Sequence, residues 1–153
     1  MFSAGATMAS AENFADPVGW AVDTSVAVAA LDAGHSAHGP CRDAVRDLRP
    51  ALAGHAAFEV YSVLTRMPGN LAVDATDAAD LVERVFPRVA AVTPESAETL
   101  RRRLPVLGIV GGAVYDALVG QAALEHGFRL LTRDHRARRT YDLLGVDYSL
   151  VGT

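Results

Sequence analysis

The sequence predicts an α/β fold in which a mainly parallel sheet is covered by helices on both faces. Short apolar runs alternate with longer segments of helical periodicity, the order that a parallel sheet requires. The chain has 153 residues, the size of one compact domain. Apolar residues make up 50% and charged residues 21%, a composition typical of globular proteins rather than disordered or fibrous ones.

The first strand and its helix are expected within residues 19–31. Residues 19–22 form a short apolar run, and the triplet 23–25, Asp-Thr-Ser, would cap a helix that begins near Val26. Asp23 would then lie at the carboxyl end of the strand. A second helix is expected over about residues 39–48, because Arg49-Pro50 stops it.

The middle of the chain predicts three helices and one strand. Apolar residues recur at nearly helical spacing over 55–66, and Pro68-Gly69 ends that helix. An amphipathic helix is expected over 74–85 and a strand over 89–92. Thr93-Pro94-Glu95 then opens another helix, and the triplet 101–103, three arginines, would close it in agreement with the helix dipole.

The C-terminal third predicts two helices that alternate with two strands. Gly111-Gly112 precede a helix that runs to about residue 126, and Asp116, Gly120 and Ala123 share one of its faces, where small residues allow close packing. A strand over 128–132, a helix over 136–144 closed by a glycine, and a last strand over 146–151 follow.

The termini and the composition limit the cellular setting. Residues 1–17 are rich in small residues and predict a flexible leader, followed by one domain over 18–153. No basic residue precedes Arg42 and no apolar run is long enough to cross a bilayer, so we expect a soluble, cytoplasmic protein without a membrane partner. Cys41, the single cysteine, cannot form an internal disulfide, which fits a reducing compartment.

Four carboxylates stand out: Asp23, Glu59, Asp116 and Asp134. The first three lie in apolar stretches, where burying a carboxylate costs several kcal/mol unless its charge is compensated. All 14 basic residues are arginines, and none lies within six positions of those three acids. Because the carboxyl ends of parallel strands share one edge, Asp23 and Asp134 are expected at the same edge, with Glu59 and Asp116 supplied by neighbouring helices.

A hard divalent cation would compensate such a cluster. Mg²⁺ and Mn²⁺ prefer oxygen ligands and retain waters, so some of the acids would act through those waters. A metal held in this way suits phosphodiester cleavage, because it activates a water and neutralises charge that builds on the phosphate. The net charge of −4 counts against a nucleic-acid partner, but five arginines against one acid over residues 129–139 provide local basic surface.

Four stretches of the sequence, VDTSVAVAAL, AFEVYSVLTRMPG, GGAVYDALVGQAALEHG and LLTRDHRARRTYDLLGVDY, resemble the PIN-domain ribonucleases, in particular the VapC toxins of bacterial toxin–antitoxin pairs. The resemblance implies a three-layer α/β/α sandwich and a Mg²⁺- or Mn²⁺-dependent endoribonuclease that is commonly a homodimer and is neutralised by a VapB-like antitoxin. It also implies catalytic and metal-site roles for Asp23, Glu59, Asp116 and Asp134.

Supporting roles follow from the same resemblance. Thr24 and Ser25 are expected to steady Asp23 through hydrogen bonds, and Thr132 to do the same beside Asp134. Arg133 and Arg136 flank Asp134 and are candidates for RNA contact. The expected substrate is RNA, with tRNA or rRNA cut at an exposed single-stranded segment.

Simpler interpretations stay open for each residue. Asp23 could be only a helix cap, Asp134 only a turn residue, and Glu59 an exposed residue or a partner of Arg66. All five histidines are interpreted as surface or packing residues, and the arginines at 101–103 as solvated or at the rim of a dimer. Two other functions also remain: a catalytically silent RNA- or protein-binding module, and a receiver-like phosphoacceptor, which the absence of lysine disfavours.

Overall fold

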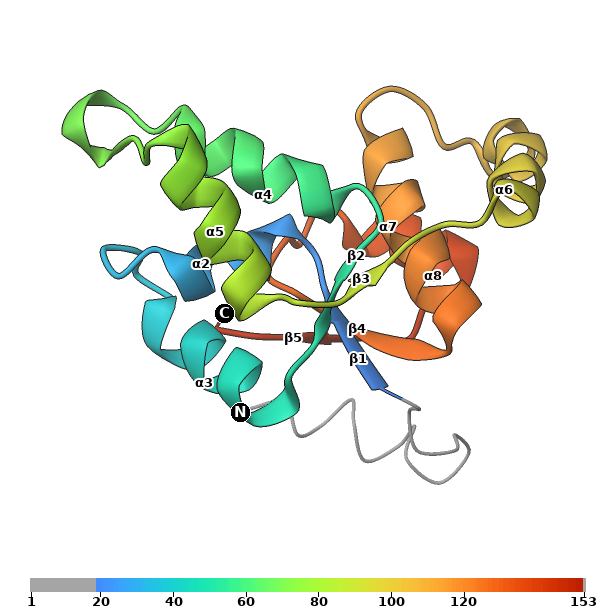
Figure 1. Cartoon of the computed structure of the whole chain (residues 1–153). Helices are drawn as coiled ribbons and strands as arrows, with labels where there is room; N and C mark the ends of the chain where they lie inside the picture. The colour runs from blue at the N-terminus through green and yellow to red at the C-terminus, as the bar shows by residue number, and fades with distance from the viewer. Residues whose placement is uncertain (1–18, 153) are drawn as a thin grey trace.

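The computed structural model describes residues 19–152, and within them the sheet has five strands in the order β3-β2-β1-β4-β5 (Figure 1). All neighbouring strands are parallel. The strands are β1 (Gly19–Val22), β2 (Ala51–Ala53), β3 (Val89–Ala90), β4 (Phe128–Thr132) and β5 (Tyr148–Leu150). The predicted leader at residues 1–17 lies outside the described residues.

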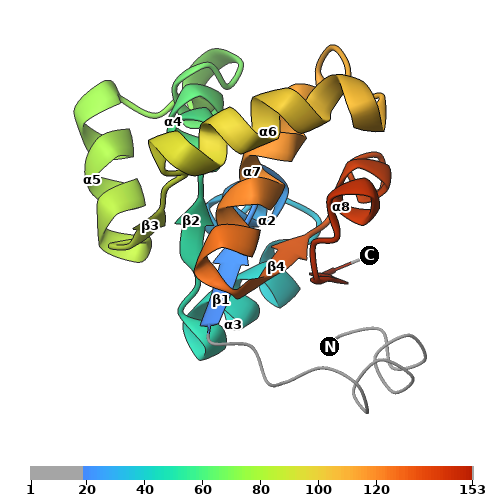
Figure 2. The ribbon, with the colours of Figure 1, turned by 90° about the vertical axis from the view of Figure 1, so that its right-hand side faces the viewer.

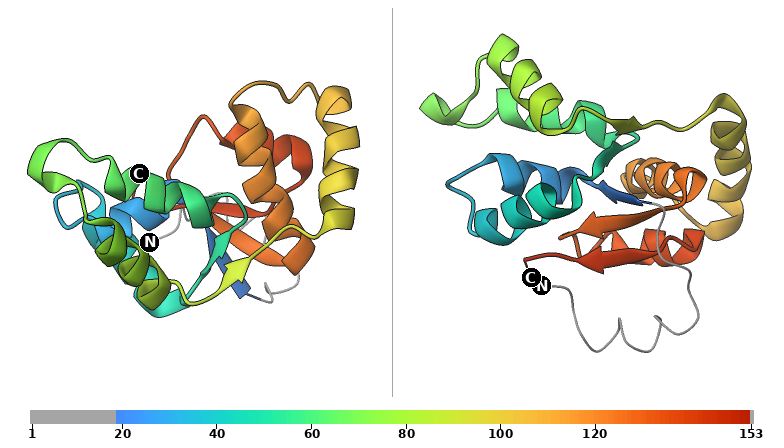
Figure 3. Two further views of the ribbon diagram at one scale, coloured as in Figure 1. Left: turned by 45° about the horizontal axis from the view of Figure 1, so that its top comes forward. Right: turned by 60° about the horizontal axis from the view of Figure 1, so that its bottom comes forward.

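Helices cover both faces of the sheet, which confirms the predicted three-layer α/β/α sandwich. One group packs together on one side and a second group on the other (Figure 3). The first group is α2 (Thr24–Leu31), α3 (His38–Leu48), α4 (Ala56–Thr65) and α5 (Ala75–Val85); the second is α6 (Pro94–Leu107), α7 (Ala113–His126) and α8 (Arg138–Leu144). A short 3₁₀ helix, η1 (Gly69–Leu71), follows α4.

The sheet centre is apolar and inaccessible to water. Ala21 and Val22 of β1 are fully buried, as are Leu130 and Leu131 of β4, with which they pair in register. Burying all four side chains from both faces explains why β1 and β4 are continuous apolar runs rather than alternating ones. Because β1 and β4 pair in register in this buried centre, the residues that follow the two strands lie next to each other at the same edge of the sheet.

Strand β2 is absent from the sequence-based assignment, which is wrong at this point. Its three residues, Ala-Leu-Ala, directly follow the αL residue Arg49 and Pro50 that end α3, and two alanines carry little strand preference. Burial by β1 on one side and β3 on the other decides its conformation. Tertiary packing therefore overrides a weak local signal.

The end of α6 is also misplaced by the sequence pattern. The helix continues through the three arginines and through Pro105 to Leu107, and Gly108 in the left-handed conformation ends it. The arginines at 101–103 therefore lie within the helix and not in its last turn. The start of α6 is as expected, because Thr93 caps it and Pro94 occupies its first turn.

Two glycines set how closely the layers approach. Gly54, with φ +50°, lies between β2 and α4, and an added Cβ would come within 2.9 Å of the Leu118 carbonyl oxygen of α7. On α7 itself, a Cβ at Gly120 would come within 3.0 Å of Val146 and 3.3 Å of Tyr141. The predicted small-residue face of α7 is thus confirmed as a close contact with α8 and the segment after it. Figure 2 shows α7 lying across the sheet beside α8.

Candidate active site at the carboxyl edge of the sheet

The strand order reverses between β1 and β4, and the four predicted acids gather at the carboxyl edge next to this point. Asp23 directly follows β1 and caps α2, while Asp134 follows β4 after one residue. Glu59 lies in the first turn of α4 and Asp116 in the first turn of α7. Ligands of open parallel sheets bind in this kind of crevice, so the topology alone marks the edge as a candidate site.

Asp23 forms the floor of the site and is almost completely buried, with 5% of its surface exposed. Its Oδ1 accepts hydrogen bonds from the Ser25 hydroxyl at 2.5 Å and from the Val26 backbone at 3.2 Å. Its Oδ2 accepts from the Thr132 hydroxyl and, at 3.1 Å, from the Tyr141 hydroxyl. Burial raises the pKa of Asp23, and these four donors act in the opposite direction.

The same hydroxyls join the two loops that end β1 and β4. Thr132 Oγ1 accepts from the Asp134 backbone amide at 3.0 Å, and Ser25 Oγ accepts from the Arg133 amide at 2.9 Å. Asp134 Oδ1 in turn accepts from the Arg136 amide at 2.9 Å. Thr132 therefore contacts the backbone of Asp134, as its expected place suggested, but its own hydroxyl proton goes to Asp23.

Thr24 does not contact Asp23, contrary to expectation. Its hydroxyl donates to Glu59 Oε2 at 3.1 Å and so links the start of α2 to α4. The alternative pairing of Glu59 with Arg66 is not found either, because the Arg66 guanidinium donates to the Ser62 hydroxyl at 3.2 Å. Within the described residues, the Thr24 hydroxyl is the one donor to the Glu59 side chain, which leaves most of its acceptor positions open.

Asp116 differs from the other three acids in having no hydrogen-bond donor within residues 19–152. It is half-buried. Burial first, and then the charges of Asp134, Asp23 and Glu59, raise its pKa to about 6. The other three acids are therefore close enough to repel it, although no three His, Cys, Asp or Glu side chains in the described part of the chain are close enough to form a ready-made metal-binding group.

Tyr141 is a site residue that the sequence did not reveal. It is fully buried on α8, and burial, followed by the nearby charge of Asp23, raises the pKa of its hydroxyl far above the usual value. The hydroxyl therefore stays protonated and keeps donating to Asp23. A tyrosine in a helix 118 positions from its partner carries no local signal of this contact.

His55 packs as predicted, and the structure adds that it does so beside two of the acids. Its ring stacks on Tyr115 with centroids 4.8 Å apart. Both rings line a cavity of about 390 Å³ between α4 and α7 that Glu59 and Asp116 also line. Aromatic side chains and two of the four acids therefore line the same cavity.

The two arginines proposed for RNA contact have different surroundings. The Arg136 side chain is 95% exposed, and its Nε lies 3.7 Å from Asp134 Oδ1. Arg133 is only half-exposed, and its buried Nε has no hydrogen-bond partner within residues 19–152. Arg136 is thus free to reach a ligand at the acidic edge, whereas Arg133 is partly enclosed.

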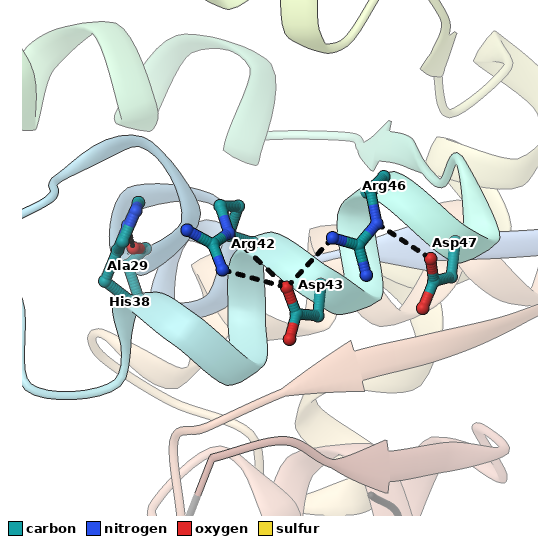
Figure 4. A network of polar contacts seen from close by, with 6 residues as sticks. All are labelled: Ala29, His38, Arg42, Asp43, Arg46 and Asp47. Carbon is teal, nitrogen blue, oxygen red and sulfur yellow. Dashed lines mark hydrogen bonds and ion pairs between the residues drawn. The ribbon is translucent and has the colours of Figure 1, made fainter.

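Five other arginines lie together on a different part of the molecule. They come from separate segments of the chain, so the sequence analysis did not identify this group. A cavity of about 700 Å³ between α3 and α5 is lined by arginines from both helices and from the segments that precede β2 and β3: Arg42, Arg46, Arg49, Arg84 and Arg88. Arg42 and Arg46 are paired with exposed acids of α3, Asp43 and Asp47 (Figure 4). None of the four candidate acids lines this cavity.

Comparisons with known proteins agree with this arrangement. A family model described as "PIN domain" matches residues 21–143. "Ribonuclease VapC27" of Mycobacterium tuberculosis (strain ATCC 25618 / H37Rv) is 46% identical over 126 residues, covering 82% of this chain and 92% of the relative. "Ribonuclease VapC40" of the same species (strain CDC 1551 / Oshkosh) is 42% identical over 137 residues, covering 86% and 98%.

The match settles the fold-level alternatives. It includes the segments that carry all four acids, and it leaves no place for the receiver-like interpretation. Within the described residues, no helix is both long and apolar enough to cross a membrane. With the family model matching most of the chain and the relatives covering most of its length, the protein belongs to the PIN-domain family, among relatives named VapC ribonucleases.

Proposed function

We propose that this protein is a divalent-metal-dependent endoribonuclease, the toxin of a VapBC-type pair, and that the acidic edge is its active site. The observation that carries the proposal is the convergence of four carboxylates from four separate segments at the point where the strand order reverses, with one of them, Asp116, receiving no hydrogen bond from the part of the chain that the structure describes. Names of the relatives supply the reaction class.

The donor set fits a hard cation. All four side chains offer oxygen, and mutual repulsion leaves Asp116 in need of positive charge. Asp116 and Asp23 are proposed as direct ligands of Mg²⁺ or Mn²⁺, with Glu59 and Asp134 acting through water. Asp23 already accepts four hydrogen bonds, which fills its acceptor positions, so direct ligation requires one donor to give way.

When bound, the cation would lower the pKa of an attacking water and neutralise charge on the phosphate and the leaving oxygen. The residues of the chain hold the acids in place. Ser25, Thr132 and Tyr141 hold Asp23, and Thr24 holds Glu59 toward the same edge. The first turns of α4 and α7, where backbone N–H groups favour negative charge, carry Glu59 and Asp116. No Ser or Cys nucleophile is required.

The partners are proposed from the family and from charge. The substrate is RNA, tRNA or rRNA cut in an exposed single-stranded segment, with Arg136 as the exposed cation nearest the acids. A VapB-like antitoxin is proposed to neutralise the enzyme by placing an arginine among the carboxylates, since guanidinium pairs well with them. Assembly as a homodimer is part of the same proposal.

A cleavage assay with the purified full chain tests the function. We expect a structured RNA to be cut with Mg²⁺ or Mn²⁺, to be spared with a chelator, and to be spared by Asp116→Asn. Asp80→Asn, which removes an exposed carboxylate of α5 away from the site, is the matched control and should cut like the parent. Equal cutting by the Asp116→Asn protein, with contaminating nuclease excluded, would overturn the proposal. RNA binding without any cutting would instead favour a silent RNA-binding module.

A further inference from the structure

The cavity between α4 and α7 has a composition that the four acids do not explain. Its walls come from one side of α4, from His55 before the helix to Arg66 after it, and from the start of α7, and its volume is about 390 Å³. Besides Glu59 and Asp116, three ring-bearing side chains and one guanidinium line it: His55, Phe58, Tyr115 and Arg66. Aromatic rings that lie beside charged and polar groups suit a flat ligand that is itself polar at its edges, such as a nucleobase.

Two of these rings are unusually open to solvent. Phe58 is 74% exposed and Tyr115 is 53% exposed. Single exposed aromatic residues are ordinary, but here both line one cavity together with two carboxylates. The stack of His55 on Tyr115 restrains the tyrosine ring before any ligand arrives, so less rotational freedom is lost on binding.

Charge decides which part of an RNA can enter. Two carboxylates line the cavity, and in the proposed function the cation that they hold takes the scissile phosphate; the rings are left for a nucleobase, which is neutral and presents a flat face. Arg66 lies at the same cavity and, within residues 19–152, pairs with no carboxylate, since its guanidinium donates only to Ser62. A guanidinium in this state can bind the phosphate that follows the base.

We propose that this cavity is the nucleobase subsite of the enzyme: the base next to the cut phosphodiester lies against Phe58 and Tyr115, and Arg66 binds a neighbouring phosphate. The inference rests on the proposed ribonuclease function and names which part of the substrate the α4–α7 mouth holds. Phe58 and Tyr115 are positioning residues in this scheme, because they hold the base so that its phosphate reaches the acids.

Fluorescence tests the stacking without relying on cleavage. In an Asp134→Asn background, Phe58→Trp places an indole in the cavity, and the chain's own Trp20 lies on β1, away from it. Titration with a single-stranded RNA octamer should quench the new indole. The same octamer with abasic sugars should not, because it offers phosphates but no base. Equal quenching by both RNAs, or none by either, would overturn the subsite.

Affinity and kinetics give the matched comparison. Phe58→Ala and Tyr115→Ala should each weaken octamer binding by roughly 5- to 100-fold, as removal of a stacking ring does elsewhere. Tyr115→Phe should bind like the parent. Val106→Ala, which truncates another exposed apolar side chain on α6 outside the cavity, is the control. In the active protein the two alanine variants should raise KM with a smaller change in kcat, and Arg66→Gln should reduce the salt dependence of binding.

The outcomes separate this inference from the function on which it rests. Base-dependent quenching in a protein that never cuts RNA would refute the ribonuclease and keep the subsite. Cutting with unchanged affinity in Phe58→Ala and Tyr115→Ala would keep the ribonuclease and refute the subsite. A parent dimer that Phe58→Ala turns into a monomer, measured by sedimentation, would assign the exposed rings to contact with a second copy and also refute it.

Discussion

The surroundings of a carboxylate differ between the floor of the acidic edge, where Asp23 lies, and its mouth, where Asp116 lies. At the floor, Asp23 is buried and receives four hydrogen bonds, two on each oxygen. At the mouth, Asp116 is half-buried and faces the charges of three other acids without one donor from the described chain. The first carboxylate receives four donors against the cost of its burial, and the second receives none from the described residues.

The two carboxylates should therefore affect the stability of the fold differently, although they lie in the same site. A carboxylate that is fully hydrogen-bonded contributes to the fold, because removing it leaves its donors buried and unpaired. A carboxylate held among like charges destabilises the fold, and a bound cation would remove this destabilisation. Variants at the two places should therefore change stability in opposite directions.

The largest effect is expected for Asp23→Ala. The change leaves the hydroxyls of Ser25, Thr132 and Tyr141 without their acceptor in a buried place, and we expect a loss of about 3–5 kcal/mol in the free energy of unfolding. Denaturant unfolding of the metal-free protein measures it. A loss below about 1 kcal/mol would show that the floor is not held together by Asp23.

Next in size is the loss of cleavage in Asp116→Asn. The amide keeps the shape but removes the charge that faces the cation, and we expect at least a 100-fold fall in kcat/KM, larger than the 10- to 100-fold typical of outer-shell residues. Initial rates at saturating Mn²⁺ provide the measurement. In contrast to Asp23→Ala, the metal-free variant should be as stable as the parent or more so, and a large destabilisation would erase the distinction between floor and mouth.

Tyr141→Phe sharpens the comparison at the floor alone. It removes one of the four donors to Asp23 while keeping the ring that packs beside Gly120, so we expect a loss of about 1.5–3 kcal/mol. Thermal unfolding with Tyr148→Phe as control, a tyrosine of β5 whose hydroxyl bonds Asp142 instead, isolates the contact. An equal loss in both variants would assign the effect to tyrosine packing in general.

The smallest predicted effect is a pH dependence that belongs to the mouth. The pKa of Asp116 is raised to about 6 from 3.8, so the folded protein binds this proton more tightly than the unfolded chain does. Stability of the metal-free protein should therefore fall as pH rises from about 4 to about 6. Because the group is half-exposed, the fall should be about 1 kcal/mol. Subtracting the profile of Asp116→Asn from that of the parent isolates it, and a difference that rises with pH would reverse the assigned sign.

Periodic segments and caps made the fold predictable from the sequence. Asp23 and Thr93 cap helices as expected, although α2 begins at Thr24 rather than near Val26, because a side-chain acceptor followed by a helical apolar pattern is a local signal. Strand β2 was not predictable, since three residues rich in alanine carry almost no local preference. The continuation of α6 through Pro105 was also not predictable, because a proline normally marks the end of a helix.

Within the site, residue types were predictable but their pairing was not. Ser25 and Thr24 are adjacent hydroxyls, yet successive helical positions point in different directions, so one reaches Asp23 and the other reaches Glu59. Tyr141, His55 and the arginine-lined cavity depend on segments brought together only by folding. Catalytic and metal-binding roles for the acids remain predictions that the assays above test.

Gly120 affects the positions of both Asp23 and Asp116 because it has no side chain. The hydrogen atom in place of a methyl group lets α7 lie against Tyr141, the same tyrosine that reaches Asp23 from α8. A larger residue here would push the two helices apart by tenths of an ångström, and Asp116 would travel with α7 while Asp23 stayed on its strand. The spacing between Asp116 and Asp23 therefore depends on a position one helical turn from Asp116 that carries no functional group of its own.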